Sequence, residues 1–237
     1  MAINYKLDLI IDDESLKILR ASQLKVTLAK PVNKEDTPNV AWIVFDPFSG
    51  NTVEWSEEYG IYASPGQVIQ NGAVITRMSE RFPAQDAAYY SFDASATFSG
   101  PFTGSGAPMK GSFKAINNMP SSLYPVLTFG LEQKASINSK GIDPSPINAA
   151  LVPASYNAVF TPLTTVYVWL QAEFTSGTVI TSINGNSASV TFGGSTTSQT
   201  LKYDPNTGRF LPSTPSGQLI SLDKAPHIMM LKREGVF

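Results

Sequence analysis

Residues 94–100 read Ala-Ser-Ala-Thr-Phe-Ser-Gly, and residues 188–194 read Ala-Ser-Val-Thr-Phe-Gly-Gly. Three other features of the first half recur in the same order in the second half: residues 44–47 match 159–162, Trp55 matches Trp169, and residues 72–76 match 177–181. Recurrence in a fixed order, with loops of unequal length between the copies, indicates an internal repeat. The sequence therefore predicts a β-rich unit that was copied in tandem.

The spacing of turn residues around these segments is typical of a β-sandwich. After Phe45, glycine, proline, asparagine or serine interrupts the chain about every eight to twelve residues. Residues 3–9 alternate between apolar and polar side chains, whereas residues 40–45 form a continuous apolar run that predicts a strand buried on both faces. We expect an all-β protein of two related antiparallel β-sandwich units, residues 1–116 and 117–237. The sequence leaves open whether the two units share one core.

Two local patterns add detail to this expectation. Residues 13–21 predict one short helix, which Asp12 or Asp13 can cap and which places Leu16 and Leu19 on one face. Residues 202–210, Lys-Tyr-Asp-Pro-Asn-Thr-Gly-Arg-Phe, predict two strands joined by a turn. These nine residues resemble the repeated sequence motif of YD-repeat shell proteins. The motif occurs once here, so we interpret it as a turn that has the same residues by convergence.

The composition narrows the classes of partner. Apolar residues make up 42% of the 237-residue chain and charged residues 15%, with a net charge of −2. No cluster of lysine and arginine predicts a nucleic-acid surface. With no cysteine and one histidine, we expect no disulfide, no His/Cys zinc site and no cofactor. Charged residues from Lys6 onward come too early for a secretory signal, and no apolar run has the length of a transmembrane helix. We therefore expect a cytoplasmic protein, or one released without a cleaved signal.

Few residues suggest catalysis. His227 lies in the apolar context Pro-His-Ile-Met-Met-Leu, which favours a structural role in the core or at a sheet edge. A β-sandwich glycoside hydrolase would need two carboxyl groups about 5–5.5 Å apart if it is a retaining enzyme. The candidates for such a pair are Glu54, Glu57, Glu58, Glu132 and Glu173. Since no spacing ties any two of them together, we predict that the protein is not an enzyme.

Residues 174–201 predict a β-hairpin with two readings. Asn184-Gly185 is a strong hairpin-turn signal, and Glu173 is the single charged residue between Pro144 and Leu201. An ordinary sandwich hairpin is the favoured reading, because the matching segment 72–100 carries several charges. The alternative is the membrane-inserting hairpin of a β-pore-forming toxin, with one face toward lipid. Its candidate lipid-facing residues are Val179, Ile180, Ile183, Val190 and Phe192.

Clustered tyrosines suggest a binding surface. Exposed aromatic rings can stack on sugars, although the same residues also fill cores, as we expect for Trp55 and Trp169. The candidate ligand-binding residues are Tyr59, Tyr62, Tyr89, Tyr90, Tyr156 and Tyr167. Our first hypothesis is a non-catalytic binding protein that engages a glycan or a membrane surface, as in defence, toxicity or adhesion, either alone or as a homo-oligomer. The alternatives are a pore-forming toxin, a glycoside hydrolase, and a structural or assembly protein.

Overall fold

Strands dominate the described part of the chain. The computed structural model describes residues 3–33, 38–66, 70–183 and 185–213, and His227 lies outside these ranges. Strands account for 51% of the described residues and helix for 4%. Within the described residues there is one helix, α1 (Asp13–Ala21), as the sequence predicted. The all-β class is therefore confirmed.

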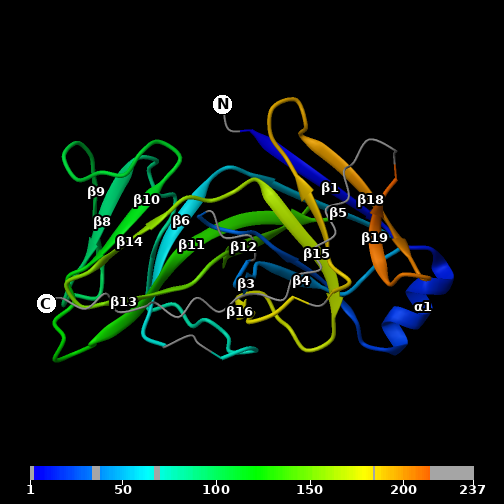
Figure 1. The fold of residues 1–237 in the computed structure, drawn as a ribbon, viewed down its shortest axis with the longest axis horizontal. Coiled ribbons are helices and arrows are strands. Elements are labelled where there is room, and N and C mark those ends of the chain that lie inside the picture. The colour runs from blue at the N-terminus through cyan, green and yellow to red at the C-terminus, as the bar shows by residue number, and fades with distance from the viewer. Residues whose placement is uncertain (1–2, 34–37, 67–69, 184, 214–237) are drawn as a thin grey trace, which may run out of the picture.

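The helix begins and packs as its sequence requires. The Asp12 carboxylate accepts a hydrogen bond from the Ser15 backbone nitrogen at 2.9 Å, so Asp12 is the N-cap. Leu16 and Leu19 are buried on the inner face. Figure 1 shows α1 at the end of the molecule opposite β8 and β9.

A nine-stranded sheet, here called the large sheet, forms the main layer. Its strand order is β19-β18-β1-β5-β11-β6-β7, and β12 and β13 also pair with β11. Most neighbours are antiparallel, but β1 and β18 run parallel. The strands are β1 (Asn4–Ile10), β5 (Gly50–Ser56), β6 (Tyr59–Ser64), β7 (Ser79–Arg81), β11 (Val126–Ile137), β12 (Lys140–Pro146), β13 (Ala150–Pro153), β18 (Ser198–Asp204) and β19 (Arg209–Pro212).

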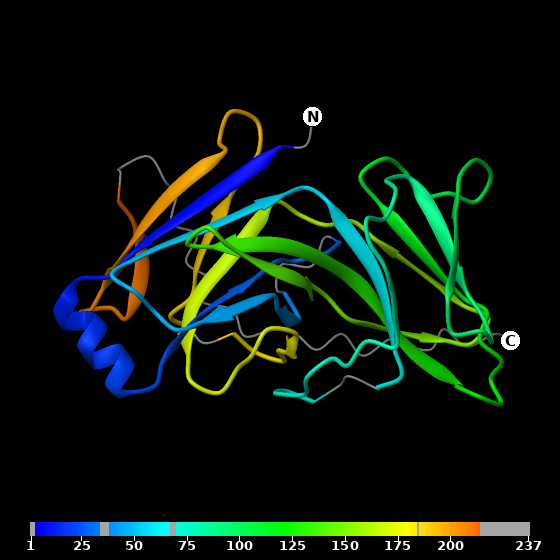
Figure 2. The same ribbon diagram turned by 180° about the vertical axis from the view of Figure 1, so that it is seen from behind.

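Three smaller sheets complete the fold. The end sheet has the order β14-β10-β8-β9, with β14 (Asn157–Phe160), β10 (Phe113–Asn117), β8 (Ala88–Phe92) and β9 (Phe98–Phe102). The facing sheet has the order β17-β15-β2-β4, with β17 (Ala188–Thr191), β15 (Thr165–Gln171), β2 (Lys25–Ala29) and β4 (Ile43–Phe45). A two-stranded sheet pairs β16 (Thr178–Val179) with β3 (Val40–Ala41). Figure 2 shows the end sheet at one end of the molecule, beside the long β11.

One aromatic core connects the large sheet to both four-stranded sheets. On the side of the facing sheet, the rings of Trp55 and Phe192 lie 5.0 Å apart. On the side of the end sheet, Phe129 of β11 meets Phe92 of β8 at 5.7 Å, edge to face. All four residues belong to a single buried cluster. Burial of such rings is the main favourable contribution to the stability of the fold.

Strands from both sides of residue 116 share every sheet. β1 pairs with β18, β2 with β15, β3 with β16, and β10 with β14. The internal duplication is not confirmed. Among the matching segments, β4 contains Val44 and belongs to the facing sheet, whereas β14 contains Val159 and belongs to the end sheet. Residues 72–76 instead lie against residues 177–181, where Val74 and Thr178 form an antiparallel bridge.

Candidate functional site

The six candidate tyrosines divide between the core and the surface. Tyr59, Tyr62, Tyr90 and Tyr167 are each at most 6% exposed, so their rings are core elements rather than ligand platforms. Tyr89 is half-buried, and Tyr156 is 64% exposed. Trp55 and Trp169 are buried, as expected. Of the six candidate tyrosines, therefore, Tyr89 and Tyr156 are the two whose rings a surface ligand can reach.

Tyr89 belongs to a row of side chains on the outward face of the end sheet. The strand register places Val159, Lys114, Tyr89 and Phe102 side by side across the four strands. Alternate residues of β8 and β10, such as Tyr90 and Ala115, are buried on the other face. The outward row is therefore open to solvent, and Phe102 is 41% exposed.

The two rings in this row form a paired aromatic surface. The centroids of Tyr89 and Phe102 lie 5.1 Å apart, with their planes tilted by 33°. Lys114 Nζ lies 5.9 Å from the centre of the Tyr89 ring and donates a hydrogen bond to the carbonyl oxygen of Gly106 at 3.1 Å. The lysine and the two rings thus form one continuous strip.

A second outward row supplies polar groups beside the rings. The register aligns Asn157, Ile116, Ser91 and Ser99 across the same four strands. Asn118 Nδ2 donates to Ser91 Oγ at 2.7 Å, which holds the hydroxyl beside the aromatic strip. The eight outward side chains of the two rows include one cation, Lys114, and no acid. We call this face the aromatic strip face.

A second feature is a buried polar cluster near the point on β11 where its pairing changes from β6 to β5. Both strands pair with the same edge of β11. Glu54 of β5 lies opposite Ser136, and Tyr59 of β6 lies opposite Gln133. Glu57 and Glu58 form the corner between β5 and β6. At the corner, Gln133 Nε2 donates to the Ser56 carbonyl oxygen at 2.7 Å, so a side-chain amide takes the place of a strand partner.

Lys30, which follows β2 directly, inserts its amine into this cluster. Its side chain is fully buried, and Nζ donates to Gln133 Oε1 at 2.9 Å and to Tyr59 Oη at 3.3 Å. A Glu57 carboxylate oxygen lies 3.5 Å from Nζ, and the Tyr59 hydroxyl donates to the other oxygen at 2.5 Å. Burial lowers the pKa of Lys30 to about 8, although the Glu57 charge opposes the shift.

Three aromatic rings enclose the Lys30 amine. Nζ lies 5.4 Å from the ring centres of Trp42 and Tyr59, and 5.7 Å from that of Trp55. Such contacts favour the charged amine, but burial has the larger effect, because the pKa of Lys30 is lowered. Burial also raises the pKa of Tyr59, so its hydroxyl stays protonated.

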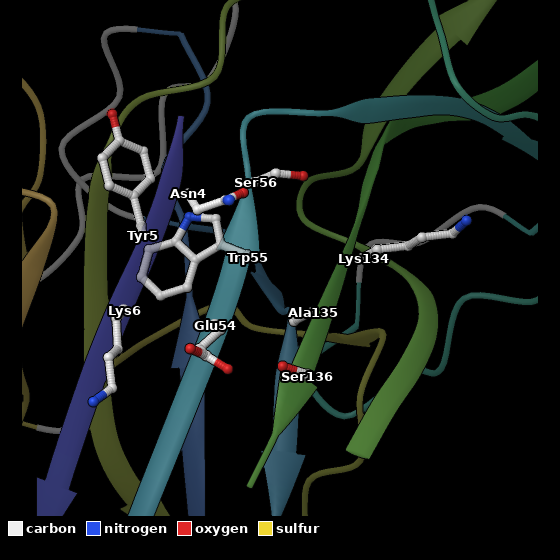
Figure 3. Close-up of a pocket in the computed structure, with 9 residues that line it drawn as sticks. All are labelled: Asn4, Tyr5, Lys6, Glu54, Trp55, Ser56, Lys134, Ala135 and Ser136. Atoms are coloured by element: carbon white, nitrogen blue, oxygen red, sulfur yellow. The ribbon is translucent and has the colours of Figure 1, made fainter. Parts of the chain in front are cut away.

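A hollow of about 410 Å³ opens on the outside of the same corner. Figure 3 shows its walls: Trp55 and Ser56 on β5 at one side, and Lys134, Ala135 and Ser136 on β11 across from them. Ser56 therefore contacts both the hollow and the amide of Gln133. The hollow lies next to the buried cluster at the point where the two strands separate.

The remaining carboxylates lie in different surroundings. Glu54, Glu58 and Glu173 are exposed, whereas the Glu132 side chain is fully buried on β11. Arg77 Nη1 contacts Glu132 at 2.5 Å and Glu80 at 2.7 Å, and so joins two carboxylates. Burial raises the pKa of Glu132 to about 6, because desolvation outweighs the attraction of Arg77.

The raised pKa of Glu132 predicts a loss of stability as the pH rises. The folded state holds this proton more tightly than the unfolded chain, so its contribution is complete below pH 4.5 and disappears as the pH passes 6. Across this range the free energy of unfolding should fall by about 2 kcal/mol. We expect Glu132→Gln to remove this pH dependence, as measured by urea unfolding between pH 4.5 and 7. Glu80→Gln, which changes an exposed carboxylate on the same arginine, should retain most of it. Identical pH profiles for Glu132→Gln and the wild type would contradict this assignment.

The predicted hairpin arms have other partners. β16 pairs with β3, and β17 pairs with β15, so residues 178–179 and 188–191 do not pair with each other. Val179, Ile180 and Phe192 are buried in the core, and Ile183 and Val190 pack partly buried against it. These apolar side chains are covered by the protein itself.

Neither metal nor membrane-helix geometry appears in the described residues. In the described ranges, no three histidine, cysteine, aspartate or glutamate side chains are grouped to hold a metal ion. Within the same ranges, no helix has the length and apolar character to cross a membrane.

The chain matches no protein-family model, no curated protein and no solved structure. Four residues that the sequence analysis did not single out complete these features. Phe102 and Lys114 belong to the aromatic strip face, and Lys30 and Gln133 belong to the buried polar cluster.

Proposed function

We propose that this protein is a non-catalytic glycan-binding protein and that the aromatic strip face of the end sheet is its binding surface. The observation that carries the proposal is the Tyr89–Phe102 pair on the outward face of the end sheet. Their ring centroids lie 5.1 Å apart, Tyr89 is half-buried and Phe102 is exposed. Two adjacent rings offer a platform for the apolar faces of successive sugar rings.

The polar groups beside the rings suit sugar hydroxyls. Ser91, Ser99, Asn157 and Asn118 supply hydroxyl and amide groups that both donate and accept hydrogen bonds. A few placed polar groups beside an apolar surface are the usual way in which a site orients a small ligand. Lys114 adds a cation that favours sugars carrying a carboxylate or sulfate group.

This arrangement favours a glycan over a lipid surface. Hydroxyls and amides lie beside the two rings on the same face of the sheet, whereas a membrane anchor presents a contiguous apolar surface. The neighbouring loop of residues 103–112 contains Met109, which is 84% exposed, but its other residues are mainly small or polar. Hydrogen-bonding capacity across the face is better used by a polyhydroxylated ligand.

The test is a glycan array followed by calorimetric titration of the best neutral and acidic hits. We expect Tyr89→Ala and Phe102→Ala each to weaken binding at least tenfold, or about 1.4 kcal/mol. Phe48→Ala removes an exposed ring outside the end sheet and should leave the affinity unchanged. A blank array at high micromolar protein would overturn the proposal, and so would binding only to lipid vesicles.

A further inference from the structure

Lys30, Gln133 and Glu57 bring three chemically complementary groups together in the core. They come from positions far apart in the sequence and meet at the corner between β5, β6 and β11. The carboxamide of Gln133 and the carboxylate of Glu57 both lie within 3.5 Å of the Lys30 amine. Nζ lies 2.9 Å from Gln133 Oε1 and 3.5 Å from Glu57 Oε1. When a fold fixes two reactive groups next to each other, their effective concentration is very high.

The surroundings favour the amine as a nucleophile. Lys30 and Gln133 are buried, with 1% and 0% exposure, so water that could hydrolyse a product is excluded. Aromatic rings of Trp42, Trp55 and Tyr59 enclose Nζ. A lysine desolvated in an apolar pocket deprotonates more easily and becomes nucleophilic, in agreement with its lowered pKa of about 8.

We propose that Lys30 and Gln133 form an intramolecular isopeptide bond, with Glu57 as the proton carrier. Glu57 takes a proton from the Lys30 ammonium group, and the free Nζ attacks Cδ of Gln133. The new Nζ–Cδ bond forms, and the Cδ–Nε2 bond breaks. Glu57 returns its proton to the departing nitrogen, which also receives the proton of the attacking amine. The net reaction converts an ammonium group and a primary amide into a secondary amide and one ammonium ion, with no change in oxidation state.

The position of Glu57 suits this transfer. Its Oε1 faces Nζ and forms no hydrogen bond in the described residues, whereas Oε2 accepts the Tyr59 hydroxyl at 2.5 Å. The tyrosine therefore fixes the carboxylate, and one oxygen remains free for the proton. A general base must lie within hydrogen-bond reach of the proton that it moves, or close to it before the reacting groups tighten.

The leaving group is hydrogen-bonded to a residue that lines a surface hollow. Gln133 Nε2, the atom that becomes ammonia, donates to the Ser56 carbonyl oxygen. Ser56 lines the hollow of about 410 Å³ that opens on the outer side of the corner (Figure 3). Release into this hollow removes ammonia from the amide and makes the reaction effectively irreversible.

The decisive measurement is the intact mass of the purified full chain, after allowing for removal of Met1. We expect a mass lower than that of the sequence by one molecule of ammonia. A tryptic digest should contain residues 26–34 joined to residues 115–134 by the same loss. An unmodified mass would overturn the proposal, and so would loss of water, which would instead join Lys30 to Glu57.

Two glutamate variants at the corner separate chemistry from folding. Glu57→Gln keeps both reacting groups but removes the proton carrier, so we expect a folded protein with the unmodified mass. Glu58→Gln changes the exposed neighbouring carboxylate and should retain the ammonia loss. Circular dichroism checks that both variants are folded. A folded Glu57→Gln protein that still loses ammonia would exclude Glu57 as the proton carrier and contradict the proposed mechanism.

Discussion

Replacing Gly130 with alanine is expected to destabilise the protein by about 3 kcal/mol or more. A Cβ atom at this position in β11 would lie 2.1 Å from the backbone carbonyl oxygen of Asn148, and 2.7 Å from the Tyr62 ring. Neither neighbour can move freely. The Tyr62 hydroxyl donates to that same carbonyl oxygen at 2.6 Å, and Asn148 Oδ1 accepts from the Leu131 nitrogen at 2.8 Å. Relief of the clash would therefore break buried hydrogen bonds.

The matched control is Gly141→Ala on β12, the strand next to β11. A Cβ there meets no atom within 4 Å, and its backbone is not in the left-handed region. We expect a change within about 0.5 kcal/mol, because the only cost or gain is in backbone freedom. Urea unfolding of both variants measures the difference. Equal stabilities for the two alanine variants would show that Asn148 does not approach β11 as closely as the structure has it.

Local patterns in the sequence predicted the strand-rich class and the helix, because these depend on neighbouring residues. The apolar run of residues 40–45 predicted one strand buried on both faces, but the structure divides it into β3 (Val40–Ala41) and β4 (Ile43–Phe45), which belong to different sheets. Consecutive residues at this break enter different cores. Val40 packs with Tyr62, Ala41 packs with Trp169, and Trp42 belongs to the large aromatic core. The Asp12 cap and the buried Leu16 and Leu19 of α1 likewise follow from local spacing.

Strand partners could not be predicted from the same patterns. Residues 178–183 and 187–192 resemble the two arms of a hairpin, yet Thr178 pairs with Ala41 and Val190 with Val166. Alternation specifies which residues share a face of a strand, but it carries no information about which distant strand lies alongside. The choice depends on burial summed over the whole fold.

In the candidate site, too, local patterns predict which residues share a face of a strand, whereas the neighbours of that face depend on the whole fold. Alternation predicts that Tyr89 and Tyr90 point to opposite faces of β8, but both faces are equally tyrosine-rich in the sequence. Only the fold shows that Phe129 and its neighbours cover the Tyr90 side, so that Tyr89 is left beside Phe102. Lys30 gave no local signal either, because its partners Glu57 and Gln133 are brought to it by strand pairing.

Replacing Trp42 with alanine should destabilise the protein by about 3–5 kcal/mol. The indole is fully buried and meets the Trp55 ring edge to face, with centroids 5.6 Å apart. Its Nε1 donates to the backbone oxygen of Gln133 at 3.1 Å, and its face lies 5.4 Å from Lys30 Nζ. Truncation would therefore leave a cavity and an unpaired carbonyl, and would remove one wall of the cage around the Lys30 amine.

Trp42→Phe separates these contributions. Phenylalanine keeps a ring against Trp55 and beside Lys30 but cannot donate to Gln133, so we expect a loss of about 1–2 kcal/mol. Thermal and urea unfolding of the two variants should therefore rank alanine well below phenylalanine. If the two variants were equally destabilised, the contacts that both substitutions remove, the hydrogen bond to the Gln133 carbonyl and the outer part of the indole, would hold this part of the core, and the ring that phenylalanine retains would contribute little. If alanine cost less than about 1 kcal/mol, Trp42 would not pack against Trp55 and β11 as described, and the aromatic enclosure of the Lys30 amine would lose its support.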